Sequence, residues 1–185
     1  MIINVITLAV KGPEIFADFF NGYVYGGDDV IKASELQELD SESIVMIPGA
    51  DNRVSETVNR TRDLLKRAIL MKAGSVYYCI LGLENQDYIH YAMPVRNMLY
   101  NAMSYTEQVE TIARYNRKNK KCNKEDYLSG FRKEDKILPV VTVTLYWGTK
   151  PWDGPVTLKD MLVETDEEIS ELVDDVNCNL FSIID

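Results

Sequence analysis

Proline followed by apolar residues at three- and four-residue spacing predicts two helices. The first begins at Pro13, carries an apolar stripe and ends at the glycine pair 26–27. The second opens at Pro94, keeps its apolar spacing through Ile112 and fades near Arg117. The pattern therefore indicates one short and one long amphipathic helix.

Runs rich in β-branched and aromatic residues predict strands. Residues 75–83 lie between Gly74 and a polar stretch, which is typical of a buried strand. Residues 137–147 form the clearest strand pattern, and Pro139 indicates an edge or a strand start. Shorter elements are predicted as a strand at 44–47, helices at 157–162 and 167–173, and an apolar segment at 180–184.

Two stretches are harder to assign. Residues 28–59 have a mixed composition, with a turn or loop predicted at 48–52. Residues 62–70 carry apolar side chains that fit a helix, while their length and the following Gly74 also fit a strand. Intrinsic propensity favours a helix for this segment.

The composition is that of an ordinary soluble globular protein. The chain has 185 residues, of which 46% are hydrophobic and 26% charged, so we expect a single domain over residues 1–185. Its apolar runs are shorter than the roughly 20 residues of a membrane-spanning helix, so no membrane partner is expected. The start of the chain lacks the basic residues of a signal peptide, and we expect a cytoplasmic protein.

Histidine and cysteine usage restricts the chemistry. Cys79, Cys122 and Cys178 are too far apart for a CxxC metal site and read as free thiols. The single histidine, His90, argues against zinc sites and against a nucleophile that relies on a histidine base. A metal site in this chain is therefore expected to use oxygen ligands.

Charge is distributed unevenly along the chain. The segment 111–136 has nine basic and four acidic residues, a net charge of +5, whereas the whole chain carries −9. A basic patch on an acidic body argues against a general polyanion binder but allows a local phosphate contact. The alternative is a solvated loop that follows a helix.

Carboxylates are the remaining candidates for chemistry. Glu84 follows the predicted strand 75–83, and Gln86 shares its face one pleat further on. Asp63 is a candidate second carboxylate, and two carboxylates with a backbone carbonyl suffice for Mg²⁺, which keeps several of its waters. The alternative is that these residues form a solvated strand end with no catalytic role.

Several segments, taken in order, resemble a known family. They are Arg62 to Lys66, Tyr78 to Gln86, Tyr91 to Tyr100, Leu138 to Gly148, and the sequence Trp-Asp-Gly-Pro at 152–155. Together they resemble the recombination-promoting nuclease/putative transposase (Rpn) family, over nearly the whole chain. That family is similar to the PD-(D/E)XK nucleases, and the resemblance implies a prokaryotic protein.

The resemblance implies a fold and a reaction. The expected fold is α/β, with a restriction-endonuclease-like core in which a mixed sheet is flanked by helices. Asp63 is expected to begin a strand, against its helical propensity, and to bind Mg²⁺ or Mn²⁺ together with Glu84 and the Asn85 carbonyl. Gln86 takes the position of the family's catalytic lysine, and it can orient water without carrying a charge. The implied reaction is metal-dependent endonucleolytic hydrolysis of DNA.

Five basic residues are candidate contacts to nucleic acid. Arg96 falls in the first turn of the long helix, where a cation opposes the helix macrodipole, so a compensating partner is expected. That partner is a DNA phosphate or a site carboxylate, and a plain surface ion pair is the alternative. The remaining candidates follow the helix and are Lys118, Lys120, Lys121 and Lys124.

Two other readings of the function stay open. One is a nucleic-acid-binding module of the same fold with weak or no catalysis, which would hold phosphates through the lysines. The other is a truncated remnant, because family members commonly continue beyond the position of Asp185. Neither the DNA sequence preference nor the oligomeric state follows from the residues, since backbone contacts carry no sequence information.

Overall fold

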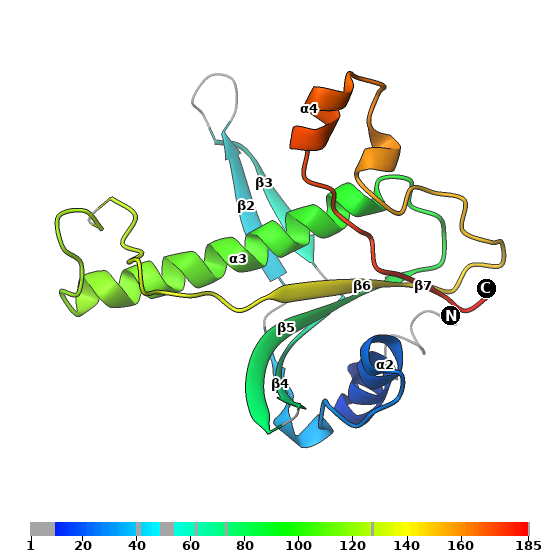
Figure 1. Cartoon of the computed structure of the whole chain (residues 1–185), viewed down its shortest axis with the longest axis horizontal. Coiled ribbons are helices and arrows are strands. Elements are labelled where there is room, and N and C mark those ends of the chain that lie inside the picture. The colour runs from blue at the N-terminus through cyan, green and yellow to red at the C-terminus, as the bar shows by residue number, and fades with distance from the viewer. Residues whose placement is uncertain are drawn as a thin grey trace.

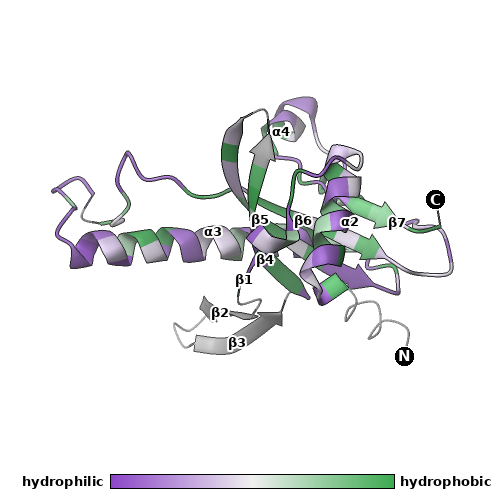
Figure 2. Cartoon of the chain, turned by 90° about the horizontal axis from the view of Figure 1, so that it is seen from below, coloured by the Kyte–Doolittle hydropathy of each residue, from purple (hydrophilic) through white to green (hydrophobic). Residues whose placement is uncertain are grey.

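The structure is a computed structural model that describes residues 10–39, 42–48, 54–61, 63–72, 74–126 and 128–184. A mixed sheet lies between the long helix α3 (Met93–Lys118) on one face and helix α2 (Pro13–Tyr25) on the other (Figure 1). The view from below in Figure 2 shows that the C-terminal end of α3 extends beyond the central sheet.

The central sheet combines antiparallel and parallel pairing. Its order is β1 (Gln37–Glu38), β4 (Leu64–Lys72), β5 (Ser75–Gln86), β6 (Val140–Tyr146) and β7 (Leu180–Ser182). The β1–β4 and β4–β5 pairs are antiparallel, whereas β5–β6 and β6–β7 are parallel. A separate hairpin pairs β2 (Glu42–Pro48) with β3 (Val54–Thr61). A mixed sheet flanked by helices confirms the α/β class.

The segment that follows residue 62 is a strand, so the helix favoured by propensity is wrong there. β4 pairs with β5 along its whole length, across a turn at Gly74, whose φ is 78°. Its side chains alternate, with Leu64 and Ala68 in the core that contains α2 and Leu65 in the smaller core beneath α3. Pairing with β5 and packing on both faces of the sheet therefore override the helical preference of this segment.

Helix α2 forms as predicted and anchors the chain that follows it. Gly26 ends the helix in the left-handed conformation, with φ 65°. Phe16 and Phe20 are fully buried against the sheet. Buried Asn21 then fixes the next segment, because its side chain accepts a hydrogen bond from Ile31 N (2.8 Å) and donates one to Ile31 O (2.9 Å).

The side of α3 that faces the sheet is more polar than its sequence pattern suggested. Buried positions recur at three- and four-residue spacing and include Met93, Asn97, Tyr100 and Ser104. Val95 and Met98, which belong to the predicted apolar stripe, are each 38% exposed. The reason is the strand surface beneath the helix, where Glu84, Thr142 and Thr144 are buried polar residues.

The smaller predicted elements are present with adjusted bounds. The strand predicted at 44–47 lies within β2, and the apolar end contains β7. Helix α4 (Glu167–Leu172) starts after Asp166, whose carboxylate accepts a hydrogen bond from the first turn. The helix predicted at 157–162 is a single 3₁₀ turn, Lys159–Met161. Most of the turn predicted at 48–52 lies outside the described residues.

Candidate functional site

Asp63 and Glu84 lie at the same end of two neighbouring strands. Asp63 immediately precedes β4, and Leu64 pairs with Leu83 of β5. Continuing this register by one residue places Asp63 beside Glu84. The Asp63 carboxylate also accepts a hydrogen bond from the backbone N–H of Asn85, at 2.7 Å. The fold therefore brings together the two acids that are 21 residues apart in sequence.

Glu84 is buried against a cation. Its side chain has no exposed surface, and its Oε2 lies 3.2 Å from Nη2 of Arg96, which is 29% exposed. The Arg96 guanidinium also lies 5.4 Å from the centre of the Tyr100 ring, one helical turn further on. Of the three partners expected for Arg96, which were a DNA phosphate, a site carboxylate and a surface acid, the structure pairs it with the site carboxylate of Glu84. This ion pair offsets the unfavourable position of a cation in the first turn of α3.

Asn85 and Gln86 present different groups to the carboxylates. Side chains alternate along β5, so Gln86 shares the face of Glu84 while the Asn85 side chain points to the other face. There the Asn85 Oδ1 accepts a hydrogen bond from Trp147 Nε1, at 3.3 Å. The backbone of Asn85, and not its amide side chain, is therefore the part that reaches the Asp63 carboxylate.

Buried polar residues behind Glu84 hold the strands and α3 together. Asn97 donates from Nδ2 to Thr144 Oγ1 and to the carbonyl of Cys178, each at 3.0 Å. Thr144 is the partner of Glu84 in the parallel β5–β6 ladder. Thr142 donates to Asn101 one helical turn along, at 2.6 Å. These contacts fix the helix that carries Arg96 relative to the strand that carries Glu84.

Sequence reasoning missed these supporting residues, although a signal was present. Threonines alternate with apolar residues in β6, and two asparagines stand four residues apart near the start of α3. Polar residues with these periods on elements predicted to be buried indicate that the facing surfaces hydrogen-bond to each other. The partners could not be paired from sequence, because Asn97 and Thr144 are 47 residues apart.

Four of the five predicted basic contacts, the lysines, lie far from the carboxylates. Lys118 ends α3, and Lys120, Lys121 and Lys124 follow it, all exposed. Arg96 and Lys118 are about 33 Å apart along the helix, at about 1.5 Å per residue. The structure therefore brings Arg96, but not the four lysines, to Glu84.

Beyond the end of α3 the chain packs back on the helix through a charged contact. Asp135 accepts hydrogen bonds from the Arg132 side chain (3.0 Å) and backbone (2.8 Å) and from Asn116 Nδ2 (2.6 Å). The Arg132 side chain, its backbone N–H and Asn116 together lower the pKa of Asp135 to about 2. Part of the basic segment is thus an ordered surface structure.

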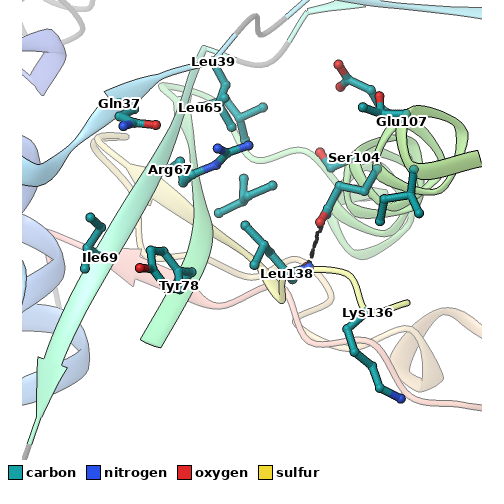
Figure 3. Close-up of a pocket in the computed structure, with 14 residues that line it drawn as sticks. Gln37, Leu39, Leu65, Arg67, Ile69, Tyr78, Ser104, Glu107, Lys136 and Leu138 are labelled. Carbon is teal, nitrogen blue, oxygen red and sulfur yellow. Dashed lines mark hydrogen bonds between the residues drawn. The ribbon is translucent and has the colours of Figure 1, made fainter. Parts of the chain in front are cut away.

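A groove of about 570 Å³ separates the second half of α3 from the sheet (Figure 3). Its walls are largely apolar and include Leu65, Ile80, Ile112 and Leu138. Arg67 projects from β4 into it, as Figure 3 shows. None of the predicted site residues lines this groove, so it is separate from the carboxylate pair.

The donor set at Asp63 and Glu84 fits a hard divalent cation. Two carboxylates and a nearby backbone carbonyl are oxygen ligands, as Mg²⁺ requires, and the ion keeps several waters. Within the described ranges no cluster of three or more His, Cys, Asp or Glu side chains could hold a metal, so a site here depends on backbone and water oxygens. His90 lies in the loop before α3, where its Nδ1 accepts from Ala92 N.

Comparison with protein-family models, with curated proteins and with solved structures finds no match to the chain. Among the residues that the structure describes, no helix combines the length and the apolar character needed to cross a membrane.

Proposed function

We propose that the chain is a metal-dependent endonuclease of the recombination-promoting nuclease type, which hydrolyses phosphodiester bonds in DNA at Asp63 and Glu84. The observation that carries the proposal is the hydrogen bond from Asn85 N to Asp63, which joins the two strand ends that the resemblance pairs. The strands agree with it, because Asp63 directly precedes β4, and Glu84 and Gln86 lie at the end of the neighbouring strand β5. We assign the sheet to a restriction-endonuclease-like core on the same grounds.

Each residue has a defined task in this proposal. Asp63, Glu84 and the Asn85 carbonyl hold Mg²⁺ or Mn²⁺, which when bound lowers the pKa of a coordinated water and neutralises charge on the phosphate. Gln86, on the same face as Glu84, orients the attacking water through hydrogen bonds. The buried pairs of α3 with β6 keep Glu84 in place while substrate binds.

The lysines beyond α3 fit a role in holding DNA rather than in catalysis. The first of these lysines, Lys118, ends α3 and lies about 33 Å from Arg96, close to the length of one turn of B-form DNA, about 34 Å, so a duplex along α3 can reach both ends. Such contacts to phosphates position the duplex without reading its sequence.

Nicking of supercoiled plasmid tests this function. The wild type should nick in Mg²⁺ or Mn²⁺ and not in EDTA, and both Asp63→Asn and Glu84→Gln should reduce nicking to background. Asp18→Asn, which changes an exposed acid on α2, on the other side of the sheet from α3, is the matched control and should cut as well as the wild type. Nicking that persists equally in Asp63→Asn and Glu84→Gln would contradict the assignment of the site.

A DNA-binding module without catalysis is the second candidate. The observation that favours it is the Arg96–Glu84 ion pair, which occupies one of the two carboxylates. This candidate predicts salt-sensitive DNA binding with no cleavage in any metal, and weaker binding with a smaller salt slope when Lys118, Lys120, Lys121 and Lys124 are replaced by Ala.

A further inference from the structure

Arg96 is the partly exposed partner of the buried Glu84. Glu84 has no exposed surface, whereas Arg96 both contacts it at 3.2 Å and is 29% exposed. Of the two paired side chains, only that of Arg96 has surface exposed to solvent. A divalent cation that reaches Glu84 from solvent meets a positive charge already in contact with the same oxygen.

The two cations cannot share Glu84 without strong repulsion. A guanidinium and a divalent ion bound to one buried carboxylate would stand within a few ångströms of each other, in surroundings that screen charge poorly. Binding of the ion is therefore coupled to movement of Arg96 away from Glu84.

The resting position of Arg96 is also incompletely satisfied. Its Nε is buried and has no hydrogen-bond partner in the part of the chain that the structure describes. A guanidinium matches the two oxygens of a phosphate in a way that satisfies Nε and Nη together. Arg96 stands in the first turn of α3, the end of a helix that favours an anion.

We propose that Arg96 exchanges partners: it neutralises Glu84 while the site holds no metal, and it turns to a phosphodiester of the nucleic acid when a divalent cation takes Glu84. This inference rests on the proposed function, because it takes Asp63 and Glu84 as the metal ligands. It makes Arg96 a substrate-binding residue whose availability depends on the metal.

Metal and nucleic acid then bind with positive coupling through Arg96. The metal releases the guanidinium for the phosphate, and by thermodynamic reciprocity the nucleic acid tightens the binding of the metal by the same factor. Arg96→Gln removes the competing cation, so it should bind metal more tightly than the wild type when no nucleic acid is present.

The test measures Mn²⁺ binding to the full chain by electron paramagnetic resonance, with and without a short phosphorothioate DNA that resists cleavage. We expect Arg96→Gln to bind Mn²⁺ about tenfold more tightly than the wild type without DNA. Added DNA should tighten Mn²⁺ binding in the wild type but not in Arg96→Gln. Arg67→Gln, which removes an exposed arginine in the groove, should behave as the wild type.

The outcomes separate this inference from the function on which it rests. Unchanged or weaker Mn²⁺ binding in Arg96→Gln, with the effect of DNA retained, would overturn the exchange and leave the metal site standing. A wild type that binds no Mn²⁺ would overturn both. If Arg96→Gln does not fold, Arg96→Lys, which keeps the charge but lacks the planar fork, serves instead. Because it keeps the competing charge, Arg96→Lys should bind Mn²⁺ as weakly as the wild type without DNA, and added DNA should still tighten Mn²⁺ binding; tenfold tighter binding of Mn²⁺ to Arg96→Lys without DNA would overturn the exchange.

Discussion

The space between α3 and the sheet differs between its two halves. Under the first half, buried polar pairs join the layers, with Arg96 against Glu84 and Asn97 against Thr144. Under the second half lies a groove of about 570 Å³ with mostly apolar walls, where Gln108 hydrogen-bonds to the Leu138 backbone. The half that is joined by buried polar side chains is closed, whereas the half with mostly apolar walls contains the groove.

The difference indicates where side chains are held in fixed positions at the expense of net stability. Buried ion pairs and hydrogen-bonded amides contribute little net stability compared with well-packed apolar side chains, but removing one partner is costly. Polar contacts in the first half therefore fix a few side chains in place. We infer that the candidate carboxylates lie beside the first half of α3 because side chains are held in fixed positions there.

Removing the cation from the closed half should have the largest effect. Arg96→Met leaves the buried carboxylate of Glu84 without its arginine and should lower the free energy of unfolding by about 3 kcal/mol. Glu84→Gln should cost about 1 kcal/mol, because the partly exposed arginine can turn to water. Urea unfolding of both variants and of the double variant measures the difference. Equal losses in the two single variants would show that the pair is not the buried contact described here.

Breaking the amide contact should have the next largest effect. Asn97→Leu removes the amide that donates to Thr144 Oγ1 and to the Cys178 carbonyl, both buried, and should cost about 1–3 kcal/mol. Thr106→Ala is the control, because the exposed Thr106 hydroxyl donates only to the Ala102 carbonyl of its own helix among the bonds described. This substitution should change the free energy of unfolding by less than about 0.5 kcal/mol. Chemical denaturation gives both values. If Asn97→Leu lowered the free energy of unfolding as little as the control does, the buried hydrogen bonds of Asn97 would not join α3 to the sheet as described.

Truncation in the open half should cost less. Ile112 lines the groove and is only partly buried, so Ile112→Ala should lower the free energy of unfolding by about 1 kcal/mol. Ile31→Ala, in the core beside α2, should cost about 2–5 kcal/mol, because Ile31 is 1% exposed. Similar losses at the two positions, measured by thermal or urea unfolding, would show that the groove is packed.

The smallest effect on stability is expected from protonation of Asp135, which packs against the C-terminal end of α3. Its pKa in the folded chain, about 2, lies below the ordinary value of 3.8 because Arg132 and Asn116 hydrogen-bond to the carboxylate. A depressed pKa means that the contact stabilises the fold above pH 4 and that this contribution disappears as the pH falls from about 4 to about 2. Carbon-13 NMR titration of the Asp135 carboxyl should give the low midpoint, and Asn116→Ala should raise it. A midpoint near 3.8 in the wild type would contradict this contact.

Helices whose ends are set by single capping residues could be predicted from the sequence. Pro13 and Gly26 set the bounds of α2, and Asp166 caps α4, because proline, glycine and a capping acid act on their own few residues. For β4, local propensity alone favours a helix and is wrong, whereas the strand that the resemblance implies after Asp63 is present. Its partner is another strand, and pairing over nine positions outweighs a weak helical preference.

The candidate site could be predicted in part. Asp63 and Glu84 were paired through a resemblance and lie together in the fold, whereas the contact between Asn97 and Thr144 depends on how α3 crosses β6. The lysines after α3 were grouped with Arg96 by charge alone. A continuous helix from Met93 to Lys118 separates them, and that distance follows from the helical pattern once the helix is taken as unbroken.

The most direct measurement is a crystal structure of the chain grown with Mn²⁺, with anomalous diffraction recorded near the manganese absorption edge. The account predicts one anomalous peak in contact with the carboxylates of both Asp63 and Glu84, and an Arg96 side chain that no longer touches Glu84. A manganese ion bound elsewhere, or no ion at this pair in a protein that nicks DNA with Mn²⁺, would contradict it.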